Sequence, residues 1–173
     1  RVALTPAGRR LVAEKFGRAV EELPAVRIGD GPFVHHDMGL TVAVALREAG
    51  AKSHHVAFRR HLFERQVRAA LGAPGGALVP DGFAEFVNAA GTAHALALEM
   101  DTGTCDPKWV AANKLVVYAE HAAARGSLLG VASWSVCMVV PTLRRVHQLT
   151  AAMWTAGVPE GLVVLKHALR NAL

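Results

Sequence analysis

The sequence predicts an α/β domain in which a mixed β-sheet is flanked by helices. Residues 78–87 and 94–100 are two strand-like stretches separated by a short turn at 88–92, a spacing that favours an antiparallel hairpin. A helix expected over 107–125 then leads to an apolar strand at 134–140. A strand–helix–strand unit of this kind pairs its strands in parallel through a right-handed crossover. Antiparallel and parallel pairing together make a mixed sheet, with helices against its faces.

The N-terminal part of the chain is predicted to be a short helix and a linker. Thr5 followed by Pro6 is a favourable helix start, and the helix is expected to continue through Glu14. Glycine and proline recur between residues 17 and 34, which is typical of a linker. We therefore assign residues 1–32 to an N-terminal helix and linker, and residues 33–173 to the α/β domain. The chain begins at Arg1 without a methionine, so we expect it to be part of a longer protein.

The stretch from residue 37 to 71 is predicted to form a helix, a short strand and a second helix. Asp37 is the expected cap of a helix that runs to Glu48 and ends at Gly50. Residues 54–58 favour a strand, and apolar residues from Phe58 to Leu71 recur at helical spacing. The arginines of this second helix are expected to lie largely off its apolar stripe; they are Arg59, Arg60, Arg65 and Arg68.

The C-terminal elements have clear start signals. Asp106 followed by Pro107 predicts the start of the helix over 107–125. Thr142 is the expected cap of the next helix, whose apolar side carries Leu143, Val146, Leu149 and Met153. Glycine and proline at 157–161 then turn the chain into an apolar strand at 162–165.

The amino-acid composition indicates a globular domain and bears on its partners. With 52% hydrophobic and 19% charged residues, the chain has the composition of a globular domain. Its net charge of +5 favours an anionic partner such as nucleic acid, although such a charge is also common in enzymes. Two cysteines do not make a disulfide scaffold and favour a reducing cytoplasm. No apolar run reaches the roughly 18 residues of a spanning helix, so we expect no membrane partner.

Three acidic residues near the predicted strand ends, Asp81, Glu99 and Asp101, form the main candidate site. The hairpin brings Asp81 and Glu99 to one end of paired strands, and Glu99 and Asp101 share a face if the strand is regular. Gathered carboxylates repel each other unless a cation joins them, and Mg²⁺ or Mn²⁺ is the kind of ion that oxygen ligands hold. A metal ion there could activate water beside a phosphate. The alternative is that these residues only cap turns, with residues 101–104 as an Asx-type turn.

The same residues resemble a known nuclease motif. Pro80-Asp81 on one strand and Glu99 on the next are similar to the PD-(D/E)xK signature. More specifically, residues 78–82, 98–104 and 114–118 resemble the replication-relaxation family of bacterial mobile-element proteins, and residues 35–37 and 63–65 resemble upstream segments of that family. The resemblance implies a restriction-endonuclease-like core in which Asp81 and Glu99 bind metal. It further implies a role in plasmid or integrative-element replication and DNA relaxation. Residues 4–8 resemble the end of that family's winged helix, which would then precede Arg1.

The chain departs from both patterns at two positions. Asp101 stands where the nuclease signature has lysine, and Thr102 stands where the family has arginine. Lys114 could replace the missing lysine and face the phosphate, although it sits about two turns into its helix and would need a bent approach. Asp101 would then assist or replace the usual lysine. Slow or absent DNA cleavage is expected.

Two other functions stay open on these residues. The first is a catalytically inactive nuclease fold that serves protein assembly or dimerisation, with a homodimer as the expected partner. The second is an unrelated small-molecule enzyme that uses the same carboxylates.

Basic residues supply the expected DNA contacts. Phosphates could be bound by Arg59, Arg60, Arg65, Arg68 and Lys114, or these residues could be a solvated surface. Lys114, Tyr118, His121 and Arg125 are predicted to share one side of their helix. The adjacent histidine pairs 35–36 and 54–55 have no zinc-binding spacing, and Cys105 and Cys137 are expected to be free thiols.

Overall fold

The computed structural model describes Glu14 and residues 33–72, 78–124 and 126–167. By internal contacts the chain divides into two units, Arg1–Phe33 and Val34–Leu173, and the description below concerns the second. The helix predicted to end at Glu14 and the linker at 17–34 lie outside the described residues, apart from Glu14 and the last two linker positions.

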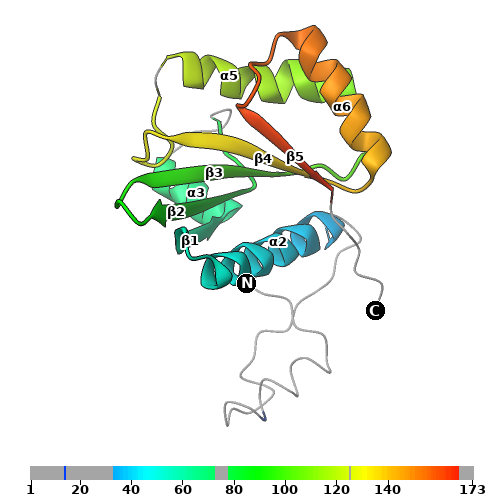
Figure 1. Ribbon diagram of the computed structural model, residues 1–173. Coiled ribbons are helices and arrows are strands. Elements are labelled where there is room, and N and C mark those ends of the chain that lie inside the picture. The colour runs from blue at the N-terminus through cyan, green and yellow to red at the C-terminus, as the bar shows by residue number, and fades with distance from the viewer. Residues whose placement is uncertain (1–13, 15–32, 73–77, 125, 168–173) are drawn as a thin grey trace. The chain divides into compact units, whose positions relative to one another are not determined.

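The second unit contains one five-stranded mixed sheet whose strand order follows the sequence (Figure 1). Strands β1, β2 and β3 pair antiparallel, whereas β3, β4 and β5 pair in parallel. The predicted α/β class, the hairpin and the parallel crossover are therefore confirmed. The strands are β1 (Val56–Phe63), β2 (Gly82–Asn88), β3 (Ala93–Met100), β4 (Trp134–Val140) and β5 (Val163–His167).

Helices cover both faces of this sheet. Residues Met38, Val42 and Leu46 of one helix, α2, pack on one face, and the α5 and α6 helices lie over the other (Figure 1). The helix predicted over 107–125 is three consecutive segments, with a wide π-helical turn in the middle. The helices are α2 (Phe33–Lys52), α3 (Glu64–Leu71), α4 (Pro107–Val110), η2 (Ala111–Leu115), α5 (Val116–Ala123) and α6 (Leu143–Ala156). None of the helices among the described residues is long and apolar enough to span a membrane.

Alternation along the strands builds two separate hydrophobic clusters. Phe83, Ala95 and Ala97 point to the face covered by α5 and α6, and each is fully buried. Ala84 and Leu98, one position away, point to the face covered by α2. Successive side chains of a strand leave opposite faces of a sheet, so the central strands are apolar on both sides.

The segment around residue 60 corrects a prediction. Apolar spacing predicted a helix from Phe58, but strand β1 continues to Phe63 and the helix begins only at Glu64. The register with β2 shifts between Phe58 and Arg60, which makes Arg59 the extra residue of a β-bulge. Pairing with β2 satisfies the backbone of this segment, and that long-range gain overrides the local apolar period. Arg59 and Arg60 therefore lie on a strand and not on a helix.

Smaller corrections concern element ends. The α2 helix begins at Phe33 and ends at Lys52, so Asp37 is inside it and does not cap its start. Gly50 lies inside the helix, and a Cβ there would lie 2.5 Å from the Cβ of Phe58, so glycine permits the close approach of this strand residue. Strand β2 begins at Gly82, so Asp81 precedes the strand.

Candidate active site at the ends of strands β2 and β3

Asp81 and Glu99 come together because their strands are antiparallel. Gly82, which begins β2, pairs with Leu98 near the end of β3, so the residues beside this pair lie at the same edge of the sheet. The Asp81 Oδ2 atom accepts a hydrogen bond from the Met100 amide at 2.8 Å. That bond ties the Asp81 side chain to the strand that carries Glu99.

Lys114 joins the two carboxylates. Its ammonium forms an ion pair with Glu99 Oε2 and lies 3.7 Å from Asp81 Oδ2. The Glu99 side chain is 1% exposed, the Asp81 side chain 15% and the Lys114 side chain 37%. The site is therefore a buried carboxylate reached from solvent past Asp81 and Lys114.

The π-helical turn contains Lys114. Asp106 caps the start of α4 by accepting hydrogen bonds from the amides of Lys108 and Trp109, as predicted. Residues Ala111–Leu115 then form one wide turn before the regular α5 helix resumes. Such insertions occur often at functional sites, because an extra residue per turn shifts the direction of the side chains that follow. Lys114 was expected to need a bent approach to the acidic residues, and this wide turn is where the helix departs from regular α-helical geometry.

Tyr118 is a member of the site that the sequence analysis did not include. It is fully buried, and its hydroxyl donates a hydrogen bond to Glu99 Oε1. The two carboxylate oxygens of Glu99 thus have different partners, Tyr118 on one and Lys114 on the other. A signal existed in the sequence, because Tyr118 lies four residues after Lys114 on the same predicted helix side.

Burial and charge shift the acid–base properties of the site. Burial, followed by repulsion from Asp81, raises the pKa of Glu99 to about 8, against the opposing effects of Lys114 and Tyr118. Burial lowers the pKa of Lys114, but attraction to Glu99 and Asp81 more than offsets this and the net shift is upward. Burial, with Glu99 second, also raises the pKa of the Tyr118 hydroxyl. A nearby cation stabilises the ionised form of a buried carboxyl, and the Lys114 ammonium is such a cation for Glu99.

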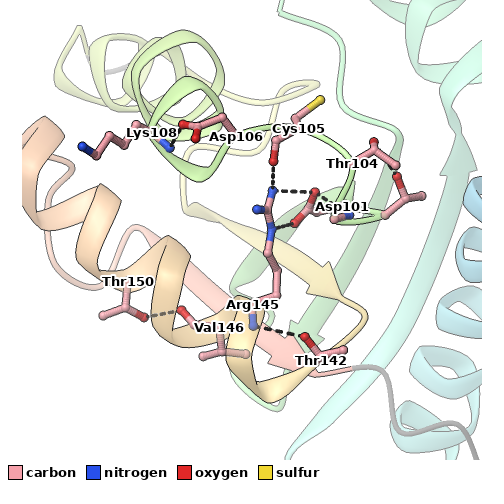
Figure 2. Close-up of polar contacts among 11 residues, drawn as sticks. Asp101, Thr104, Cys105, Asp106, Lys108, Thr142, Arg145, Val146 and Thr150 are labelled. Carbon is pink, nitrogen blue, oxygen red and sulfur yellow. Dashed lines mark hydrogen bonds and ion pairs between the residues drawn. The ribbon is translucent and has the colours of Figure 1, made fainter.

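Asp101 forms an ion pair with Arg145, whereas its predicted role was to assist or replace the lysine of the nuclease motif. It is 8% exposed and accepts two hydrogen bonds from Arg145, at 2.6 Å from Nε and 3.2 Å from Nη2. Arg145 also donates to the carbonyl of Cys105 at 2.8 Å, so it ties the loop after β3 to α6 (Figure 2). The amide of Gly103 donates to Asp101 Oδ1, which is the Asx-type turn weighed as the alternative. Asp101 thus supports a loop, and Arg145 was missing from the predicted site.

The predicted DNA-contacting arginines divide into two groups. Arg59 and Arg60 of β1 both form ion pairs with Glu85, at 2.8 and 2.6 Å. On α3, Arg68 forms an exposed ion pair with Glu64 at 3.1 Å, and Arg65 is exposed. Lys114 belongs to neither group, because its partners are the acidic residues. The four arginines therefore do not share one helix face, and Arg125 of the other predicted basic face lies outside the described residues.

The residues present suit a cation bound by few protein ligands. The described part of the chain contains no group of three or more His, Cys, Asp or Glu side chains arranged to hold a metal ion. Mg²⁺ is commonly held by one or two carboxylates together with waters and substrate phosphate oxygens. Asp81 and Glu99 fit that mode, since one ammonium already contacts both of them.

Comparison with known proteins found no relative whose site could be compared with this one. No family model, no curated protein and no solved structure matches the chain.

Proposed function

We propose that the domain binds and processes DNA through a nuclease-like metal site. Asp81 and Glu99 would hold Mg²⁺ or Mn²⁺, and Lys114 would face the scissile phosphate. The observation that supports this most directly is the contact of one lysine ammonium with both carboxylates. Two acids and a lysine at one sheet edge are the residue types that metal-dependent phosphodiester cleavage uses.

Each residue would have a distinct task. A bound divalent cation would activate water and neutralise charge that builds on the phosphate. Lys114 has three N–H donors and would move part of its charge from the carboxylates to a phosphate oxygen. Tyr118 holds Glu99 Oε1, and the Met100 amide holds Asp81 Oδ2, so both acids keep their orientation. Such preorganisation is what electrostatic catalysis requires.

The wider assignment rests on resemblance. A restriction-endonuclease-like fold is compatible with the mixed sheet, and similarity to the replication-relaxation family supports a role in mobile-element replication. DNA affinity of the domain itself would come from Lys114 and the exposed arginines of α3, Arg65 and Arg68. It should be weak and sequence-independent, roughly 10⁻⁴–10⁻⁶ M at physiological salt, and should fall steeply as salt rises.

A plasmid-nicking assay with Mg²⁺ or Mn²⁺ tests the proposal. We expect slow nicking that Asp81→Asn and Lys114→Met abolish. Two exposed residues of the same helical segment provide matched controls, Lys108→Met and Glu120→Gln, and both should retain activity. Nicking that survives Asp81→Asn would refute the metal site.

Thermal unfolding separates metal binding from turnover. Either cation should raise the melting temperature, because a ligand that binds only the folded state stabilises it by mass action. The stabilisation should disappear in Asp81→Asn and persist in Glu120→Gln.

Assembly is the second candidate, and the surface of α6 favours it. Trp154 is 74% exposed and Leu143 is 60% exposed. Trp154 also lines a hollow of about 360 Å³ together with Val163 and Leu165 of β5. Large exposed apolar side chains at the edge of a sheet are typical of interaction sites. A stable dimer in analytical ultracentrifugation that Trp154→Lys dissociates, together with no nicking and no DNA binding at low salt, would favour this function.

A further inference from the structure

A second site lies at the other end of the sheet, where the structure has a cavity of about 580 Å³. The cavity is bounded by β1, by the start of β3 and by residues Leu129–Ser133. Glu85, in its wall, pairs with Ala95, and Glu99 is four residues farther along β3, about 13 Å away at 3.3 Å per residue. Its volume is that of a small-molecule site, and it is separate from the acidic site.

The β-bulge brings two adjacent arginines to one wall of this cavity. Neighbouring residues of a regular strand point to opposite faces, but the bulge at Arg59 lets both Arg59 and Arg60 reach Glu85. Glu85 is 2% exposed, and Arg60 also stacks over the Phe83 ring at 5.0 Å. The buried carboxylate thus orients both guanidinium groups before any ligand arrives, and the aromatic ring adds a contact to Arg60.

The cluster keeps positive charge and hydrogen-bond donors for a ligand. Two guanidinium groups face one carboxylate, so one positive charge is not neutralised within the cluster. Arg59 Nη1 and Arg60 Nε donate to Glu85, and Arg60 Nη2 donates to the Leu129 carbonyl. Within the described part of the chain, Arg59 Nε, Arg59 Nη2 and Arg60 Nη1 have no hydrogen-bond partner. Arg59 is also 63% exposed, so its remaining donors are accessible from solvent.

A strained turn forms the opposite wall. Leu129 has φ 50° and Gly130 has φ 84°, and Leu128 and Val131 exchange two backbone hydrogen bonds of 3.0 Å across them. A left-handed leucine is unfavourable for an L-residue, whereas glycine adopts this conformation readily. The Leu129 carbonyl accepts a hydrogen bond from Arg60 Nη2 at 3.3 Å, which ties the turn to the arginine wall. Backbone strain of this kind gathers at ligand-binding sites.

We propose that this cavity binds the phosphate group of a nucleotide-sized molecule. Arg59 and Arg60 would hold the oxyanion, since guanidinium donors match phosphate geometry. Ala93, Leu129 and Val131 add apolar side chains that suit a base, and the hydroxyls of Thr92 and Ser133 suit a sugar. The phosphate could belong to a free nucleoside monophosphate or to the 5′ end of a nucleic acid strand. The site goes beyond the proposed function because it needs neither a metal ion nor the carboxylates of Asp81 and Glu99.

Calorimetric titration of the full chain at low salt tests the proposal. The probes are inorganic phosphate, a nucleoside monophosphate, and one short oligonucleotide with and without a 5′-phosphate. Arg59→Gln should weaken binding of the phosphorylated probes by about tenfold or more, since it removes charge-assisted hydrogen bonds. Arg144→Gln changes the net charge equally, but Arg144 is exposed on α6 and lies outside the cavity, so the effect of this variant should stay below about twofold.

A cavity-filling variant tests whether the hollow itself is used. Ala132 is exposed at the rim, so Ala132→Trp should fold normally, block the nucleoside monophosphate and leave inorganic phosphate binding intact. Free nucleotide binding as tightly as the phosphorylated oligonucleotide supports a small-molecule site, and preference for the phosphorylated end supports a nucleic-acid site. The proposal is overturned if no probe binds at millimolar concentration, or if Arg144→Gln weakens binding as much as Arg59→Gln.

Discussion

The buried ion pair between Arg145 and Asp101 allows a quantitative test of the fold. Arg145 is 5% exposed and is the partner of a carboxylate that is 8% exposed. Arg145→Met would leave Asp101 buried without its cation and would remove the bond to the Cys105 carbonyl. Removing one partner of a buried pair typically costs about 3–5 kcal/mol. For a chain of this size that corresponds to a fall in melting temperature of roughly 6–20 °C.

Urea unfolding monitored by circular dichroism measures this loss. Arg144→Met is the matched control, because Arg144 is the exposed neighbour on the same helix, and it should change stability by less than about 0.5 kcal/mol. The double variant Arg145→Met with Asp101→Asn should be less destabilised than the sum of the single variants, since it removes the uncompensated charge. Equal effects of Arg145→Met and Arg144→Met would refute the reasoning and remove the proposed anchor of the loop after β3.

Three further predictions concern single groups. The folded-state pKa of Glu99, about 8, lies above the ordinary value of 4.5, so protonation of the Glu99 carboxyl favours the folded state. That contribution is complete below pH 4.5 and is lost as pH rises through about 8; the stability of the wild type relative to Glu99→Gln should therefore fall across this window in urea titrations at several pH values. Burial raises the pKa of Cys137, whereas Cys105 is exposed, so iodoacetamide should add one label to the native protein at Cys105 and a second only after unfolding, as mass spectrometry would show. Thr142 caps α6, so Thr142→Ala should lose about 1 kcal/mol in urea unfolding while Thr142→Ser retains most of it; equal stability of the two variants would contradict the cap.

Much of the site could be located from the sequence because the relevant signals are local. The short turn between two strand-like stretches was sufficient to predict that Asp81 and Glu99 meet at one sheet edge. The caps Asp106 and Thr142 were also correct, since a cap depends on a residue and on the amides two or three positions later. Local bonds of this kind need no knowledge of the rest of the fold.

The errors arose where a distant segment decides the structure. Residues 59–63 have helical apolar spacing, yet they pair with β2, which lies some twenty residues farther along the chain. The wide turn that contains Lys114 was not predicted either, because it has no distinctive residue pattern. In both segments tertiary contacts outweigh a weak local preference.

The α/β class, the hairpin, the parallel crossover and the meeting of Asp81 and Glu99 could be predicted from the sequence, because strand-like stretches, short turns and capping residues are signals that span a few positions. The partners of the acidic side chains, in contrast, depend on long-range packing. Arg145 reaches Asp101 across 44 residues, and Lys114 and Tyr118 reach Glu99 across the packing of a helix on the sheet. Burial makes these partners necessary, since a carboxylate removed from water is stable only when it is paired, hydrogen-bonded or protonated.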